Sequence, residues 1–441
     1  MASVVSKVVE YIIPISDNGG SSSELIRVFG GPGIGDVRSR LIRLIPTSPN
    51  SPSTIAMKTL FNHRLSSTPS EAREEWHQIV EGTHPLWQDI PSQKLELIRS
   101  FFNTINLEIL KRTRKTSAFN FQTASVGNLF LTGARLFTGS FESAIYLFGA
   151  ITNVPANIKV IPAINSNFSH HIAAGLQDGT QIVGQNEISH PSAPTAFPSS
   201  FPSPYDHDTP HEDAHLPGSL PSLRKQNIIF AKSHTSDLPT PIERIWYINP
   251  YGQELRPTPN PKVLQAIKEA NGVVYSIGSL YTSILPCLIL RGVGSAIREK
   301  PFKILILNGS LDRETRWEGG EYTAKEFVRA IARAGWSSEF PPAELGGVIG
   351  AEGGGEVGEM EYRCYVSHII HLQGEGTPRV DKAEMARLGI ETVRIYGRRR
   401  EGEGGMVYDG TALEQALEAI MGRRDLRSDR SRRNTLGNAL S

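Results

Sequence analysis

The chain of 441 residues is poor in cysteine, with Cys287 and Cys364 as its only two. Two cysteines this far apart give neither a disulfide framework nor the paired spacing of a zinc site, and they fit a reducing compartment. No stretch approaches the roughly 18 to 20 consecutive apolar residues that cross a membrane. The first residues show no basic segment followed by an apolar one, so we expect no signal peptide and a cytosolic location.

An excess of either charge is also missing, because 46 Lys and Arg stand against 45 Asp and Glu. A balanced chain creates no basic field that would attract nucleic acid. We therefore expect neither nucleic acid nor a membrane as a partner. The hydrophobic content of 39% is ordinary for a globular protein, and the length leaves room for two or three domains.

Apolar runs of strand length alternate with amphipathic helical stretches along most of the chain. Val8–Ile15 and Phe302–Leu307 are near-continuous apolar runs, typical of strands buried on both faces. Such alternation predicts a doubly wound, Rossmann-like α/β fold, with a mostly parallel sheet and helices on both faces. Gly175–Val183 differs from this pattern, because Asp178-Gly179 at its centre predicts the turn of a hairpin.

Two segments interrupt the alternation. Residues 189–222 are dense in Pro and Ser and poor in aliphatic residues, so they cannot bury enough surface to offset chain entropy, and we predict a disordered insertion there. Residues 341–360 have the composition of a Gly/Glu linker. The other predicted parts are a ligand-binding core (1–188 and 223–340), a C-terminal α/β unit completing it (361–421) and a charged tail (422–441).

The first predicted strand leads into the loop Asp17-Asn18-Gly19-Gly20-Ser21-Ser22. Loops of this kind, at the ends of parallel strands, are where α/β sheets hold phosphorylated ligands through backbone N–H groups and hydroxyls. Asp17 either holds Mg²⁺ against phosphate oxygens or forms the Asx turn that ends its strand. As a ligand-site carboxylate without partners, it would lose no thermal stability on replacement by asparagine.

A second glycine-rich turn follows as Gly33-Ile34-Gly35-Asp36-Val37-Arg38. Asp36 opens a helix, where the macrodipole favours a carboxylate with or without a function, and in a transferase it is a candidate general base. Arg38, one turn further, either reaches a phosphate with both guanidinium arms or is an exposed surface arginine. The spacing Ser21-x-x-Glu24 predicts a capping box at the start of the preceding helix.

Later loops supply the remaining candidate ligand contacts. Ser125, Gly127 and Asn128 open a helix, where they bind a ligand or, alternatively, provide a cap from Ser125 and close packing at Gly127. Tyr281 either stacks on a base or sugar or is a half-buried wall residue. The other candidates, all in loops that follow predicted strands, are Gly278, Ser279, Thr282, Ser283, Asn308 and Arg313.

Taken together, these blocks resemble the CofD/YvcK superfamily. Four blocks match its pattern in order: 17–22 with 35–38, 125–129 with 153–154, 278–283, and 308–315 with 322–324. The resemblance spans roughly residues 8 to 335, and more weakly the chain to about residue 421. It implies binding of a nucleoside diphosphate conjugate of the guanosine or the UDP-sugar type, and it leaves open a homodimer.

Two functions are known in that superfamily. CofD proteins transfer a phospholactyl group from a guanosine diphosphate donor to a deazaflavin hydroxyl, whereas YvcK proteins bind UDP-sugars and regulate carbon metabolism without an assigned reaction. The resemblance implies Mg²⁺-assisted transfer, with Asp17 as the metal ligand and Asp17 and Asp36 as the catalytic pair. The alternative is a non-catalytic UDP-sugar sensor.

One departure concerns the N-terminus. Superfamily members usually begin with a strand and a Gly-Gly-Thr-Gly-like turn ahead of the strand that corresponds to Val8–Ile15. Only Met1–Lys7 precede that strand here. We expect the genomic frame upstream of Met1 to encode the additional strand and turn.

Overall fold

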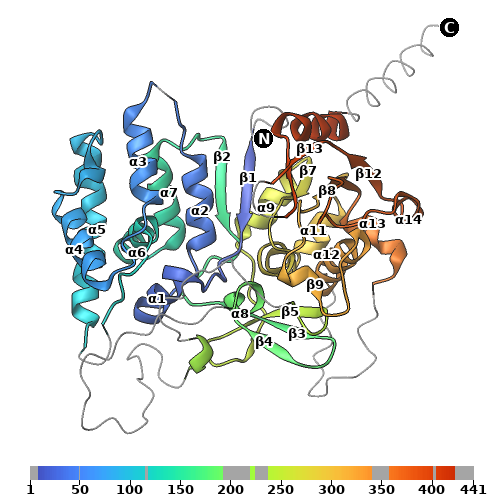
Figure 1. Cartoon of the computed structure of the whole chain (residues 1–441), viewed down its shortest axis with the longest axis horizontal. Helices are drawn as coiled ribbons and strands as arrows, with labels where there is room; N and C mark the ends of the chain where they lie inside the picture. The colour runs from blue at the N-terminus through green and yellow to red at the C-terminus, as the bar shows by residue number, and fades with distance from the viewer. Residues whose placement is uncertain are drawn as a thin grey trace. The chain divides into compact units, whose positions relative to one another are not determined.

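The computed structural model describes residues 8–48, 50–114, 118–191, 219–223, 237–339, 357–400 and 404–422. The chain divides into two compact units. Figure 1 colours the chain from blue at the N-terminus to red at the C-terminus. Unit 1 comprises Met1–Val9, Pro261–Leu280 and Leu288–Ser441, and unit 2 comprises Glu10–Asn260 and Tyr281–Cys287. No helix of the described residues is both long and apolar enough to span a bilayer.

Unit 1 is built on a parallel sheet of four strands in the order β12-β11-β8-β7. The strands are β7 (Gly272–Tyr275), β8 (Phe302–Ile306), β11 (His368–His371) and β12 (Glu391–Arg394). Ile304 and Leu305 point to opposite faces of β8, and each is at most 1% exposed. Both faces of the sheet are therefore covered, which confirms the doubly wound α/β fold.

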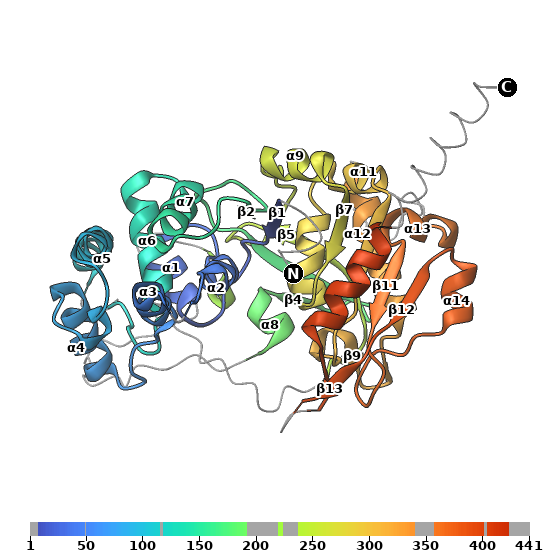
Figure 2. The same ribbon diagram turned by 90° about the horizontal axis from the view of Figure 1, so that it is seen from above.

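The helices of unit 1 supply that cover. They are α9 (Pro261–Glu269), α11 (Val293–Arg298), α12 (Ala324–Glu339), α13 (Tyr362–Tyr365), α14 (Lys382–Arg387) and the helix of residues 410–422. This last helix, drawn in red in Figure 2, packs Leu413, Leu417 and Ile420 against Ile304 and Ile370 of the sheet. The smaller elements are η4 (Arg313–Thr315), η5 (Glu359–Glu361), β9 (Arg316–Trp317), β10 (Gly320–Glu321), β13 (Gly397–Arg399) and β14 (Met406–Tyr408).

Unit 2 is mainly helical. Its helices are α1 (Gly20–Phe29), α2 (Gly35–Leu44), α3 (Pro52–Asn62), α4 (Pro69–Glu81), α5 (Ser92–Arg112), α6 (Val126–Thr138), α7 (Phe141–Thr152) and α8 (Gln185–Ser189), with η1 (Pro85–Trp87) and η2 (Pro221–Leu223). Aromatic residues that are fully buried form its core, among them Phe61, Trp76, Phe102 and Phe130. Phe130 lies edge-on to Phe61 at 5.0 Å between ring centroids, an arrangement that adds to the stability gained from burial.

Strands accompany these helices at two places. β1 (Val9–Ile13) pairs with β2 (Ile158–Pro162). A second, antiparallel sheet has the order β4-β3-β5-β6, with β3 (His171–Leu176), β4 (Gln181–Val183), β5 (Ile242–Ile248) and β6 (Glu254–Leu255). The pairing of β3 with β4 confirms the hairpin whose turn was predicted at Asp178-Gly179.

The predicted insertion 189–222 and linker 341–360 lie mostly outside the described residues. Their described edges are ordered. Ser189 ends α8, and Ser219 is 2% exposed. Leu220 and Leu223 pack against Ala173 of the antiparallel sheet, because aliphatic side chains at this end of the segment can join a core. Val357, at the end of the predicted linker, is buried as well.

Gly294 allows α11 to approach α12 closely in unit 1. A Cβ added at Gly294 would lie 2.0 Å from the carbonyl oxygen of Gly335, a distance that no real side chain tolerates. We therefore expect Gly294→Ala to lower the unfolding midpoint of unit 1 in denaturant titrations. Gly149→Ala in α7 is the matched control, because its nearest atom would be 3.9 Å away and alanine favours a helix. Equal stability of the two variants would contradict the close packing.

Candidate active site

The carboxylate of Asp17 accepts three hydrogen bonds from three different pieces of chain. Its Oδ1 accepts from the backbone N–H of Gly19 at 3.0 Å, which is the Asx turn that ends the first strand segment. Its Oδ2 accepts from the hydroxyl of Ser22 in α1 at 2.5 Å and from the N–H of Gly35 in α2 at 3.1 Å. Asp17 therefore fixes the first turns of both helices.

The second glycine-rich turn closes directly onto Asp17. The N–H of Gly33 donates to the carbonyl oxygen of Ile15 at 2.8 Å. A Cβ at Gly33 would lie 2.1 Å from the carbonyl oxygen of Asp17, and one at Gly35 would lie 2.0 Å from its Oδ2. Only glycine allows the backbone to come this close to Asp17, so Gly33 and Gly35 are needed for the geometry of the site.

Asp36 stands in the first turn of α2 without a complete set of partners. Its Oδ2 is buried and makes no hydrogen bond within the described part of the chain. Burial, and next the negative charge of Asp17, raise the pKa of Asp36 from its usual 3.8 to about 7, against the opposing effects of Gln185 and Arg38. Burial, with the charge of Asp36, also raises the pKa of the Cys287 thiol to about 12, which keeps that thiol protonated.

A chain of polar contacts joins this carboxylate pair to the start of α6. Arg38 donates from Nε to Oδ1 of Asn128 at 3.2 Å, and Asn128 donates from Nδ2 to the Ser21 hydroxyl at 3.0 Å. The N–H of Ser125 donates to the same hydroxyl at 3.2 Å. The structure thus brings together the first two predicted blocks. Burial, and next the charge of Arg64, lower the pKa of Arg38 to about 10.

The structural alternatives proposed for this loop hold. Ser125 is the N-cap of α6 and accepts from the N–H of Asn128. Gly127 allows close packing, because a Cβ there would lie 2.6 Å from the carbonyl oxygen of Phe61. That Ser125, Gly127 and Asn128 also contact a ligand stays a prediction.

The capping box predicted at Ser21 and Glu24 is wrong. α1 has Gly19 as its N-cap and no side-chain cap. The Ser21 hydroxyl turns instead to the start of α6, and Glu24 forms a buried ion pair with Arg27 at 2.7 Å. Glu24 also accepts from the N–H of Asn120 at 2.6 Å. Tertiary partners satisfy both side chains, so neither is available for the local cap that the spacing suggested.

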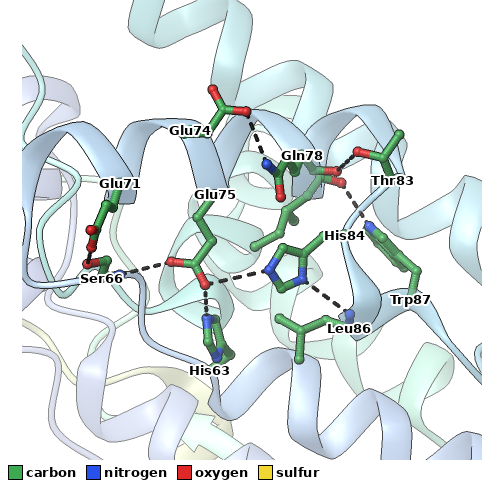
Figure 3. A network of polar contacts seen from close by, with 11 residues as sticks. His63, Ser66, Glu71, Glu74, Glu75, Gln78, Thr83, His84, Leu86 and Trp87 are labelled. Carbon is green, nitrogen blue, oxygen red and sulfur yellow. Dashed lines mark hydrogen bonds and ion pairs between the residues drawn. The ribbon is translucent and has the colours of Figure 1, made fainter.

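A polar cluster around Glu75 of α4 fixes the position of His63, whose backbone contacts the loop of Ser125. Figure 3 shows Glu75 between His63 and His84, with its Oε1 2.6 Å from Nε2 of His63 and 3.7 Å from Nε2 of His84. Its Oε2 accepts from the N–H of Ser66 at 2.9 Å. The carbonyl oxygen of His63 in turn accepts from the N–H of Val126 at 3.1 Å. The cluster thereby positions the start of α6.

This cluster is a hydrogen-bond network and not a set of metal ligands. Nδ1 of His84 accepts from the N–H of Leu86 at 3.2 Å, so the ring hydrogen sits on Nε2, the nitrogen that faces Glu75. Burial lowers the pKa of His84, which favours this neutral form. Across the described ranges, no three His, Cys, Asp or Glu side chains gather in a way that could hold a metal ion.

The predicted 278–283 block divides between the two units. Tyr281, Thr282 and Ser283 belong to unit 2, in the π-helical turn Leu280–Ile284. Tyr281 is 4% exposed and donates its hydroxyl hydrogen to the carbonyl oxygen of Ile242 at 2.9 Å. A buried ring held by this hydrogen bond agrees better with a residue in the wall of the site than with a ring that stacks on a base or sugar. Thr282 is buried and Ser283 partly buried.

The other candidates of that region belong to unit 1. Asn308 and Gly278 exchange two hydrogen bonds, of 3.2 Å to Asn308 Oδ1 and 3.0 Å from its Nδ2. These bonds join the loops that follow β7 and β8. Arg313 lies in η4, where Asp312 forms a capping box with Thr315. Ser279 lies between Gly278 and the π-helical turn.

Three contributors to the unit 2 site were missed from the sequence. Gln185 of α8 hydrogen-bonds Asp36, and Asn186 donates its N–H to Oδ1 of Asn18 at 2.9 Å. Arg64 pairs in an isolated bridge with Ser125 and is close enough to lower the pKa of Arg38. No motif or spacing in the sequence points to these residues. The residues of α8 come far along the chain, after a hairpin, and Arg64 lies just beyond the end of α3.

Comparison with known proteins identifies the class. A solved structure of a UPF0052 family member from Bacillus halodurans has a TM-score of 0.54 and 20% identity, covering 93% of this chain and 91% of that one, so the two share a fold. Residues 2–394 match the family described as 2-phospho-L-lactate transferase CofD, and the chain belongs to that family.

Relatives by sequence agree with this assignment. The uncharacterized protein YNL011C of Saccharomyces cerevisiae is 38% identical over 409 residues, which are 87% of this chain and 88% of the yeast protein. A protein of Halalkalibacterium halodurans named gluconeogenesis factor is 22% identical over 320 residues, 73% of this chain and 64% of that protein.

The three bonds of Asp17 contradict the premise that it has no partners, so we now expect its replacement to change stability. In Asp17→Asn an NH₂ group stands where one carboxylate oxygen accepted, so the N–H of either Gly19 or Gly35 loses its acceptor. We expect a loss of about 1–3 kcal/mol in the free energy of unfolding without ligand, measured by denaturant titration. A variant as stable as the wild type would show that these bonds contribute nothing.

The raised pKa of Asp36 predicts a pH-dependent effect of Asp36→Asn. A carboxyl group whose pKa is raised in the folded state stabilises the protein at low pH, and this contribution is lost as pH rises from the usual 3.8 to about 7. The variant should therefore already exceed the wild type in melting temperature at pH 5, and the difference should grow towards pH 7 and then stay constant to pH 8. Asp178→Asn is the control, because the lowered pKa of Asp178 keeps it ionised over that range. A difference independent of pH would refute the shift.

Proposed function

We propose that this protein is a CofD-like transferase that binds a nucleoside diphosphate conjugate and transfers its phosphorus-containing group to an acceptor hydroxyl. The observation that carries the proposal is Asp36, a carboxylate with an unpaired buried oxygen and a pKa near 7 beside a second carboxylate. Carboxyl groups tuned to neutral pH in this way concentrate at catalytic sites. The family match gives the reaction class.

Asp36 is suited to the role of general base. With a pKa of about 7 it is partly ionised at neutral pH and can accept a proton there. In the proposed reaction the acceptor hydroxyl attacks phosphorus in line, its proton passes to Asp36, and a nucleoside monophosphate leaves. Asp17 is a poorer candidate for the base, because both of its oxygens already accept hydrogen bonds.

Anion-binding groups surround this pair. The N–H groups of Gly20 and Ser21 open α1, where the helix itself offers them no acceptor. Arg38 uses Nε for Asn128 and keeps its two terminal nitrogens without a hydrogen bond to the described residues. Backbone N–H groups at a helix start and a guanidinium suit the oxygens of a diphosphate. The proposal assigns the diphosphate to these groups.

Mg²⁺ fits the residues present, as judged from Asp17 Oδ1. That oxygen accepts only one hydrogen bond, from the N–H of Gly19, and so keeps an acceptor position. Mg²⁺ is commonly bound by one or two carboxylates together with phosphate oxygens, so Asp17 would hold it, and Asp36 remains the base. A bound cation would neutralise charge that develops on the transferred group.

A second candidate is a regulator that binds a UDP-sugar without turnover. It is favoured by the relatives named gluconeogenesis factor, of which several match this chain at 21% to 25% identity. A regulator needs the same anion-binding groups but has no use for a carboxyl group with a pKa near 7. Asp36 therefore favours the transferase.

Phosphorus-31 NMR separates the two. Wild-type protein is incubated with Mg²⁺, a deazaflavin acceptor, and guanosine- or uridine-type diphosphate conjugates. The transferase predicts release of a nucleoside monophosphate, with a rate at least about 100-fold lower in Asp36→Asn and unchanged in Asp178→Asn. Saturable binding of a UDP-sugar without product would support the regulator, and failure to bind any conjugate would contradict both.

A further inference from the structure

The side chain of Asn186 is buried without a partner. It is 3% exposed, and neither Oδ1 nor Nδ2 makes a hydrogen bond within the described part of the chain. Buried carboxamides are normally paired at both ends, so one with neither end paired calls for a missing partner. Asn186 lies in α8, outside every motif that the sequence singled out.

The carboxamide is aimed at the Asp17 loop. A Cβ atom added at Gly19 would lie in van der Waals contact with both oxygens, 3.6 Å from Asn186 Oδ1 and 3.5 Å from Asp17 Oδ1. The N–H of Asn186 donates to Asn18 Oδ1 at 2.9 Å. Two oxygens from distant parts of the chain thus lie close to the same point beside Gly19.

The two oxygens beside Gly19 favour a cation over an anion. Both oxygens have an unused acceptor position, since Asp17 Oδ1 accepts only from Gly19 and Asn186 Oδ1 accepts nothing. An anion placed there would be repelled by Asp17, and Asp36 adds a second carboxylate nearby. Carboxylate and amide oxygens are the ligands that Mg²⁺ prefers. A cation alone, however, would leave Asn186 Nδ2 unpaired.

We infer that Asn186 is a ligand of a metal–diphosphate complex, with Oδ1 on the divalent cation that Asp17 also binds and Nδ2 donating to a phosphate oxygen. This inference rests on the proposed function and adds α8 to its site. Such a complex satisfies both ends of the carboxamide at once, and its arrival breaks no hydrogen bond that the carboxamide makes in the free protein.

The inference predicts opposite effects on stability and on binding. Leucine is close in size to asparagine and has no polar atoms, so Asn186→Leu should leave the melting temperature of the metal-free protein unchanged or higher. The same variant should weaken Mn²⁺ binding in the presence of UDP by at least about tenfold, measured by electron paramagnetic resonance. Asn186→Asp, which keeps an oxygen and adds charge, should bind Mn²⁺ at least as well as the wild type.

Asn120→Leu is the matched control. Asn120 is equally buried, but its Oδ1 accepts from the N–H of Gln122 at 2.9 Å. We expect this variant to melt at a lower temperature and to bind Mn²⁺ like the wild type. The two leucine variants should therefore differ in opposite senses in the two measurements.

The outcomes separate the inference from the proposed function. If wild type and Asn186→Leu bind UDP and Mn²⁺ equally well, the inference fails and the proposed function stands. If Asn186→Leu lowers the melting temperature of the metal-free protein as Asn120→Leu does, the carboxamide is a structural group and the inference also fails. If the wild type binds neither UDP nor GDP, nor a conjugate of either, the proposed function itself is wrong.

Discussion

The site of unit 2 depends on one carboxylate and its three donors. Asp17 joins its own loop to the first turns of α1 and α2, and the glycines of the second turn are needed so that the chain can reach it. These bonds also hold the Asp17 carboxylate close to Asp36. Burial, and next the negative charge of Asp17, raise the pKa of Asp36 to about 7. The fold thus creates the chemistry through electrostatics.

Buried polar groups in unit 2 are of two kinds. Glu24 and Arg27 satisfy one another and tie α1 to the segment around Asn120, so they contribute to stability. Asp36 Oδ2 and the carboxamide of Asn186 are equally enclosed but lack partners. Groups left unpaired lower stability and persist where a ligand completes them. Their proximity to Asp17 is the reason to place function here rather than at the well-satisfied Glu75 cluster.

Local patterns predicted the fold well and the contacts of the site less well. The apolar run of β8 and the loop at Asp17 were recognisable because a buried strand and a glycine-rich turn leave a local signature. The use of Ser21 was not, because a residue 104 positions later supplies its partner. Asn186 and Gln185 carry no signature either, since a hairpin and not a sequence spacing brings them to the loop.

The central claim is that burial, and next the charge of Asp17, raise the pKa of Asp36 to near neutral pH. A carbon-13 NMR titration of the aspartate carboxyl groups, with Asp36→Asn used to assign the signal, tests it most directly. The account predicts a midpoint for Asp36 close to 7 in the ligand-free wild type. A midpoint for Asp36 near the usual 3.8 would contradict the account and remove the basis for its role as the base.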